Sequence, residues 1–272
     1  QGTYFRLGYG SYNDMRLIAS NYTKVNEQLG LSFSGNYHHN DGFFTNLHTH
    51  KKADKLDNGA GRIGLTWKPA THWTTRFITS YEYSNQGGYP YGLYNADKGT
   101  TEAVNYNNEG LYRRNLLTSG INIRYNGPHI SFNSQTSYQY IQDKMGIDQD
   151  FSPRNIFYGQ NKIRQHMYCQ EFTVKSVNKS RYHWITGAFV FRQTINRKVD
   201  LSRFTDTTRH LTNSGIPTQG IAFYHQSTLD LLQGLSCSVG LRYDYEHARC
   251  DFSKVQQPLN GNGETKSLEQ FN

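Results

Sequence analysis

A strict alternation of apolar and polar residues constrains this chain more than any other feature of its sequence. In the segment 235–246 the intervening residues are polar or glycine, and every second residue is apolar: Leu235, Cys237, Val239, Leu241, Tyr243 and Tyr245. Successive side chains of a β-strand point to opposite faces, so this segment predicts a strand with one apolar and one polar face. At about 3.4 Å per residue it spans about 40 Å. That is longer than the usual strand of a soluble protein and, when tilted, long enough to cross a bilayer.

The alternation recurs along the chain and predicts about eleven strands. The clearest segments are 29–38, 62–68, 73–83, 117–125, 130–140 and 235–246, and the weaker ones are 3–9, 15–23, 163–177, 182–198 and 219–231. Short turns are predicted at 24–26, 69–72, 126–128, 178–181 and 232–234, and long loops at 41–58, 84–110, 142–162 and 199–218. Only the connection 10–14 is short where a long one is due. Long loops at one end and tight turns at the other are typical of outer-membrane barrels.

Composition supports the same fold class and excludes several others. The chain has 272 residues, with 21 Tyr and 15 Phe but only 3 Met, which favours strands over helices. No apolar run approaches the roughly 18 residues of a membrane-spanning helix. The net charge of +8 is dispersed, so nucleic acid is not an expected partner. Three cysteines without a C-x-x-C pair indicate neither a disulfide framework nor a zinc site.

We therefore predict an all-β protein, an antiparallel up-and-down transmembrane β-barrel that is partial and forms one domain over 1–272. Aromatic residues close many of the strands and suit the interfacial girdles of such barrels: Trp67, Trp73, Tyr83, Tyr125, Tyr140 and Trp184. The alternatives are a passive outer-membrane porin, or a soluble β-sandwich or surface module that binds a glycan or a protein. In a sandwich, the polar face would simply be exposed to solvent.

Several motifs occur in an order that resembles the barrel of TonB-dependent outer-membrane receptors. They are DGFFTN at 41–46, NGAGRIGLTWKP at 58–69, DFSP at 150–153, QEFTVKS at 170–176, W-x-x-G-x-F at 184–189, AFY at 222–224 and GLRYDYE at 240–246. The resemblance covers most of the chain and implies a barrel of about 22 strands around a plug domain. The sequence contains no plug domain and no TonB box. We therefore expect a fragment of a longer receptor that transports nothing alone.

The resemblance also implies a function, namely energy-coupled import of a scarce nutrient across the outer membrane of a Gram-negative bacterium. The implied cargo is a ferric siderophore, with haem as an alternative, and no intrinsic cofactor is expected. The implied partners are outer-membrane lipid, the iron chelate, and the TonB system acting through the plug. An enzyme is not expected, because no G-x-S-x-G, H-E-x-x-H, Walker or G-x-G-x-x-G motif is found.

Two groups of residues are candidates for binding the ligand. Tyr89, Tyr91 and Tyr94 lie in a predicted long loop, where rigid amphipathic side chains suit ligand capture. Arg62 and Arg124 fall on the polar face of predicted strands, where they would attract an anionic chelate. The alternatives are loop packing for the tyrosines and a solvated face for the arginines.

Four histidines form a candidate metal or haem site. His38, His39, His48 and His50 lie within 13 residues, at the end of a predicted strand and in the loop that follows it. Imidazole binds iron, copper and zinc, and a haem iron takes an axial histidine. The alternative is that a polar loop simply carries histidines, since no carboxylate or cysteine lies at metal-ligand spacing.

Overall fold

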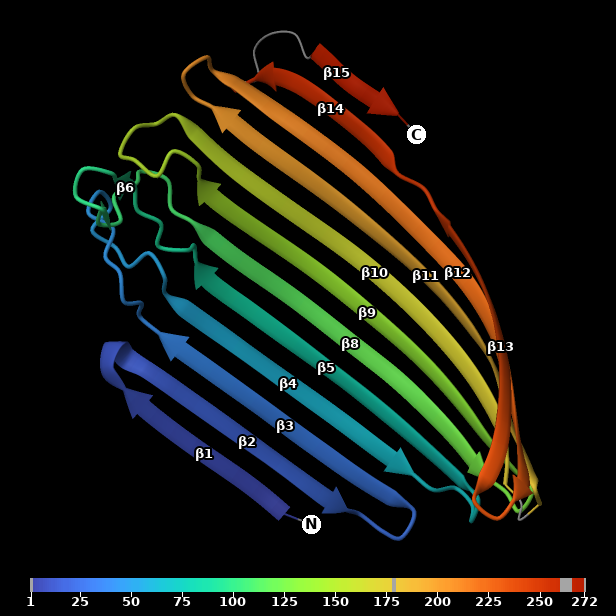
Figure 1. Ribbon diagram of the computed structural model, residues 1–272. Coiled ribbons are helices and arrows are strands. Elements are labelled where there is room, and N and C mark those ends of the chain that lie inside the picture. The colour runs from blue at the N-terminus through green and yellow to red at the C-terminus, as the bar shows by residue number, and fades with distance from the viewer. Residues whose placement is uncertain (1, 178–179, 260–265, 272) are drawn as a thin grey trace.

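The structure is a computed structural model that describes residues 2–177, 180–259 and 266–271. Its long strands form one antiparallel sheet of thirteen strands in up-and-down order (Figure 1). These strands are β1 (Gly2–Gly10), β2 (Asp14–Lys24), β3 (Leu29–Asn40), β4 (Leu56–Trp67), β5 (Trp73–Gly87), β8 (Leu111–Asn126), β9 (Ile130–Asp148), β10 (Phe157–Ser176), β11 (Tyr182–Arg203), β12 (Thr208–Leu232), β13 (Leu235–Ala248), β14 (Asp251–Pro258) and β15 (Lys266–Phe271). The other elements are the 3₁₀ turn η1 (Ser11–Asn13) and a separate small hairpin of β6 (Tyr94–Asn95) and β7 (Thr100–Thr101).

All eleven predicted strands are confirmed, and the sheet has two more, β14 and β15. Strands β13 and β14 follow one another along the same side of β12, β13 beside its second half and β14 beside its first. The described part of the sheet is open, with β1 at one edge paired only to β2. No helix among the described residues is long and apolar enough to cross a membrane.

Two of the four predicted long loops are wrong. Within 142–162, β9 continues to Asp148 and β10 begins at Phe157, and within 199–218 the chain turns only between Arg203 and Thr208. The side-chain alternation lapses in these stretches: in residues 208–214 of β12, Leu211 is the single apolar residue. The backbone ladder continues regardless, because its hydrogen bonds do not depend on the side chains.

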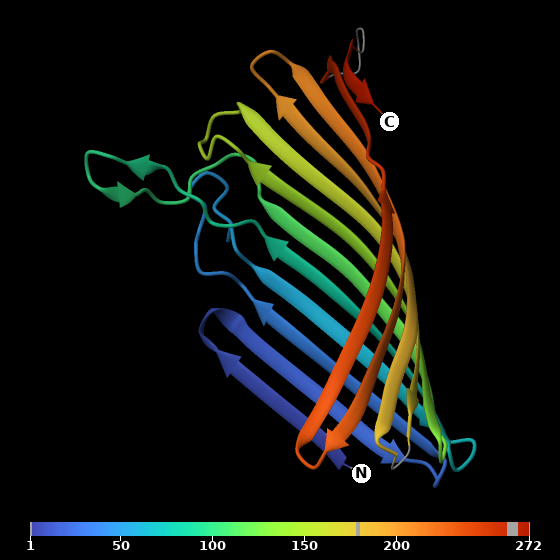
Figure 2. The same cartoon turned by 45° about the vertical axis from the view of Figure 1, so that its right-hand side comes forward.

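The short turns and the other two long loops are confirmed, although residues 178 and 179 of one predicted turn lie outside the described part of the chain. The turns gather at one end of the sheet, here called the turn end, and the loops at the other, the loop end (Figure 1). The loop 88–110 carries the β6–β7 hairpin, which projects away from the sheet (Figure 2).

The two faces of the sheet differ in chemistry over its central and turn-end part. On one face, the apolar face, aligned positions read Leu31, Leu65, Phe77 and Ile121 across β3, β4, β5 and β8. On the other, the polar face, they read Ser34, Arg62, Ser80 and Thr118.

The apolar face is uncovered. Leu241 is 79% exposed and Val239 is 70% exposed, and only four apolar residues of the described chain are buried: Val104, Tyr106, Leu211 and Ala222. A soluble sandwich buries such a face against a second sheet. The described residues provide no such second layer, so the sandwich alternative is wrong. An exposed apolar surface of this extent marks contact with lipid or with another protein.

Candidate ligand-binding site

Three loops meet at the loop end of the sheet. They are the β3–β4 loop (41–55), the β5–β8 loop (88–110) and the β9–β10 loop (149–156). The backbone N–H of Leu47 donates to the carbonyl of Val104 at 2.9 Å, and the N–H of Asn107 donates to the carbonyl of Ser152 at 3.3 Å. The β5–β8 loop is therefore hydrogen-bonded to both of its neighbours.

Glycines allow the close approach on which this cluster depends. A Cβ atom added at Gly88 would lie 2.7 Å from the Cα of Gly110, at the neck where the β5–β8 loop leaves the sheet. A Cβ atom added at Gly87 would lie 1.9 Å from the carbonyl oxygen of Ala53. Both contacts are too short for any side chain, so the neck of the loop can pack here only as glycine.

Asn46 holds two of the loops together. It is 2% exposed, and its side-chain amide donates to the carbonyl of Tyr106 at 2.8 Å. Its side-chain oxygen accepts from the N–H of His48 at 3.0 Å and from the N–H of Tyr106 at 3.3 Å. The buried side chain of Asn46 thus provides hydrogen-bond partners for both the backbone N–H and the carbonyl of Tyr106, which lies in another loop. Water does not reach these backbone groups, so the side chain takes its place.

Asp148 anchors the third loop. Its carboxylate is buried and accepts the backbone N–H groups of Asn108, Asp150 and Phe151 at 3.1, 3.1 and 2.9 Å. Hydrogen bonds to a charged acceptor are roughly twice as strong as neutral ones. The end of β9 is thereby fixed to both the β5–β8 loop and the β9–β10 loop.

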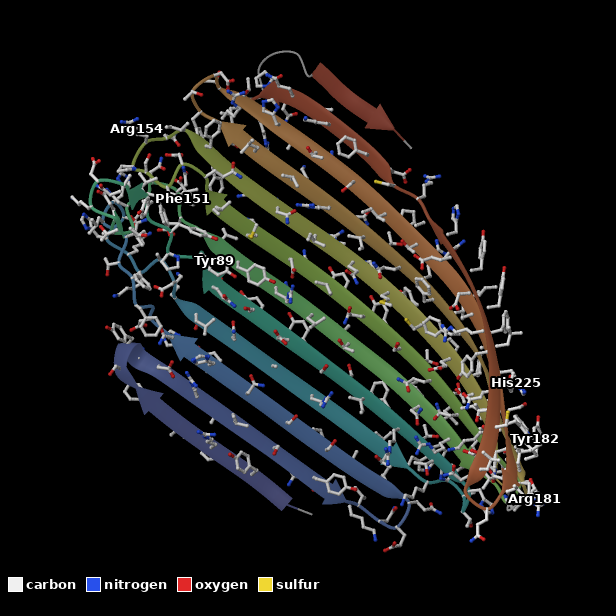
Figure 3. The ribbon with its side chains drawn as sticks, in the orientation of Figure 1. Tyr89, Phe151, Arg154, Arg181, Tyr182 and His225 are labelled. Atoms are coloured by element: carbon white, nitrogen blue, oxygen red, sulfur yellow. The ribbon has the colours of Figure 1, made fainter. Side chains whose placement is uncertain are left out.

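An aromatic pocket of about 440 Å³ opens between these loops, with walls that include Tyr89, Tyr91, Tyr106, Tyr112 and Phe151. The ring centroids of Tyr91 and Phe151 are 4.9 Å apart, and those of Tyr89 and Tyr91 are 5.8 Å apart. Figure 3 shows Tyr89 and Phe151 at the loop end, far from Tyr182 at the turn end. Ligand pockets in proteins typically enclose about 300–1,000 Å³ with mostly apolar walls, so this pocket suits a small molecule.

Tyr106 supplies a polar group without a protein partner. The residue is 3% exposed, and its buried hydroxyl forms no hydrogen bond within the described residues. Burial, together with the nearby charges of Asp148 and Asp54, raises the pKa of the Tyr106 hydroxyl above its usual value. The phenol therefore stays protonated and able to donate. Buried polar groups normally have a partner, and this hydroxyl has none within the described residues.

The structure brings together two of the three predicted tyrosines. Tyr89 and Tyr91 line the pocket, whereas Tyr94 lies in β6, 69% exposed on the projecting hairpin (Figure 2). Phe151 was not predicted as a site residue. It comes from another loop, and nothing in the sequence indicates its contact with Tyr91.

The two predicted arginines lie apart from the pocket. Arg62 is in the middle of β4 and Arg124 is near the turn end of β8, and both are exposed on the polar face. Within the described residues neither forms an ion pair. Neither of them lines the loop pocket.

The four predicted histidines do not converge. His38 and His39 point to opposite faces of β3: the imidazole of His38 contacts Asp14 at 3.1 Å, and that of His39 contacts Asp57 at 2.7 Å. His48 and His50 are exposed in the β3–β4 loop. Among the described residues, no group of three or more His, Cys, Asp or Glu side chains is placed to hold a metal ion.

Comparison with solved structures identifies the fold. The ferric yersiniabactin uptake receptor FyuA from Yersinia pestis matches 98% of this chain with a TM-score of 0.77 and 14% sequence identity. The ferripyoverdine receptor of the outer membrane of Pseudomonas aeruginosa matches 93% with a TM-score of 0.56 and 10% identity. This chain has the fold of an outer-membrane receptor barrel wall.

The match is to part of those structures. The chain spans 42% of the length of the yersiniabactin receptor and 40% of the ferripyoverdine receptor. The copper transporter OprC also matches, with a TM-score of 0.52 and 11% sequence identity. The match covers 94% of this chain and 44% of the transporter chain. No protein-family model and no curated protein matches the sequence.

Proposed function

We propose that this chain is part of the barrel of a TonB-dependent outer-membrane receptor that imports a ferric siderophore into a Gram-negative cell. The observation that carries the proposal is the likeness in fold to the ferric yersiniabactin uptake receptor over 98% of the chain. The exposed apolar face suits contact with lipid, and the polar face suits the inside of a water-filled barrel. The chain is neither an enzyme nor the holder of an intrinsic cofactor in this proposal.

The loop pocket is the proposed entry site of the ligand. A siderophore offers rings, which suit the aromatic walls of the pocket. Arg62 and Arg124 attract an anionic chelate further along the polar face. The plug and its connection to TonB belong to the rest of the complete protein, and they convert capture into energy-dependent import.

The cargo is the open part of the proposal, because the same fold includes a copper transporter. Haem is the alternative iron cargo, and His48 and His50 are the exposed imidazoles of the loop end that would meet it. Within the described residues they form no metal site with other side chains, so the proposal favours a chelate that arrives with its iron already coordinated.

The test is uptake of radioactive iron by iron-starved cells that carry or lack the gene. Ferric siderophores of different classes and haemin are supplied separately, with and without a functional TonB. Uptake of one ferric siderophore that requires both the gene and TonB is the expected result. Uptake that persists without TonB indicates a passive porin instead, and uptake of haemin alone assigns haem as the cargo.

A further inference from the structure

The walls of the loop pocket attract positive charge. Its rings are those of the four tyrosines and the phenylalanine named above, and the charged residues that line it are Asp54 and Asp148. The face of an aromatic ring carries partial negative charge, so it attracts a cation placed over it. The two carboxylates add full negative charges. Among the described residues, no Lys, Arg or His lines this pocket.

The two carboxylates form no ion pair within the described residues. Asp148 is 2% exposed, and its partners are the three backbone N–H groups described above. Asp54 accepts the backbone N–H groups of Phe43 and Phe44 at 3.0 and 2.9 Å. Burial and the charges of both carboxylates raise the pKa of the Tyr106 hydroxyl. Buried charges are normally paired with an opposite charge, so a cation would complete this pocket.

The cations of the surrounding loops and strands are placed elsewhere. The guanidinium of Arg114 is paired with Asp143 at 2.7 Å. Arg154 lies at the loop end with Phe151 (Figure 3), but it is exposed and lines a different pocket. The lysines of the β3–β4 loop line a separate pocket of about 280 Å³: Lys51, Lys52 and Lys55. The described chain therefore leaves the loop pocket open to a cation from a ligand.

The volume of the loop pocket sets the size of that ligand group. A cavity of about 150 Å³ holds one benzene molecule, and the loop pocket encloses about 440 Å³. It has room for an aromatic ring together with a small amine. The iron centre of a chelate need not enter the pocket.

We propose that the loop pocket binds a positively charged organic group of the ligand, namely an amine borne by the ferric chelate, and excludes carboxylates. This inference deepens the proposed function and rests on it, because the loop pocket is the entry site of the chelate there. The aromatic rings contact the amine through their faces, and Asp54 and Asp148 balance its charge. The chelate as a whole can still be anionic and meet Arg62 and Arg124 along the polar face.

The test uses three probes that share a phenyl ring and differ in charge. They are benzyltrimethylammonium, benzyl alcohol and benzoate, and their dissociation constants are measured by saturation-transfer NMR on the complete protein in a non-ionic detergent. The wild type should bind the ammonium about tenfold more tightly than the alcohol, as several cation–π contacts predict. Benzoate should bind more weakly than the alcohol, because the carboxylates of the pocket repel it.

Two variants test the groups that select the charge. Asp54→Asn removes one negative charge and keeps Oδ1, which accepts both backbone N–H groups. Its control is Asp97→Asn, which removes the same charge from an exposed position between β6 and β7. Tyr91→Leu replaces a ring with an apolar side chain, and its control is Tyr94→Leu on the hairpin. Each pocket variant should reduce the preference for the ammonium to about threefold or less, and each control should keep it.

Equal binding of the ammonium and the alcohol by the wild type would overturn the inference, and so would tighter binding of benzoate. A preference that survives in both pocket variants would also overturn it, because the ammonium would then bind elsewhere. Heat-modifiable migration in gel electrophoresis verifies that each variant has folded. Tyr91→Leu leaves every hydrogen bond of the loops in place, so it carries the test if Asp54→Asn does not fold.

These outcomes are separable from those of the proposed function. A protein that imports a ferric chelate but shows no preference for the ammonium refutes the cation site alone. A protein that prefers the ammonium, but whose gene has no effect on TonB-dependent iron uptake, refutes the proposed import alone.

Discussion

Replacing Asn46 with alanine should release the β5–β8 loop without unfolding the sheet. The change removes the partners of both backbone groups of Tyr106, a residue that is 3% exposed. A buried group left without a partner costs about 1–3 kcal/mol, so the two groups together cost about 3 kcal/mol. At 1.4 kcal/mol per factor of ten, the population of the released loop should rise about a hundredfold.

Amide hydrogen exchange of the detergent-solubilised protein measures this population directly. The amides of Tyr106 and Leu47 should lose about a hundredfold of their protection, whereas amides in the middle of β9 should keep theirs. Asn95→Ala is the control, because it removes only exposed hydrogen bonds in the projecting hairpin, one to Glu102 at 2.8 Å and one from the N–H of Lys98 at 3.1 Å. Unchanged protection of Tyr106 in Asn46→Ala would refute the assignment of Asn46 as the residue that holds the loops together.

Two further substitutions test the pocket and the sheet. Tyr91→Ala removes the ring that contacts Phe151 and should weaken binding of a ferric chelate about tenfold. The control Tyr94→Ala, on the hairpin, should change the affinity for the chelate less than about twofold. Equal effects of the two substitutions in a fluorescence titration would contradict the pocket assignment. Arg114→Gln leaves the carboxylate of Asp143, with a side chain 13% exposed, without its ion pair and should lower the free energy of unfolding by about 2 kcal/mol. The control Arg113→Gln loses only a hydrogen bond to an amide and should change the urea midpoint little.

The strand order could be predicted from the sequence, but the strand ends could not. From Leu235 to Tyr245 every second residue is apolar, and this period of two fixes both the strand and its faces. Near the loop end the same rule fails, because Lys162 and Arg164 occupy the positions where apolar residues would mark the strand. There the strand is defined by backbone pairing alone, and this pairing becomes visible only when the neighbouring strands are in place.

The candidate site was predictable only within one loop. Tyr89 and Tyr91 are close in sequence, and their loop could be recognised by its length. The contacts that complete the pocket join separate loops, as Phe151 joins Tyr91 and Asn46 joins Tyr106. The register of the sheet decides which loops become neighbours, and the alternation of side chains does not encode that register between distant strands.

The orientation of the sheet in the outer membrane tests the central claim most directly. The measurement uses single cysteines in the complete protein, with the three native cysteines Cys169, Cys237 and Cys250 replaced by serine. Tyr94→Cys at the loop end should react with a membrane-impermeant maleimide on intact cells, and Gln233→Cys at the turn end should react only after the outer membrane is permeabilised. Equal labelling of both on intact cells, or the reverse order, would contradict a wall that spans the outer membrane with its loops outside.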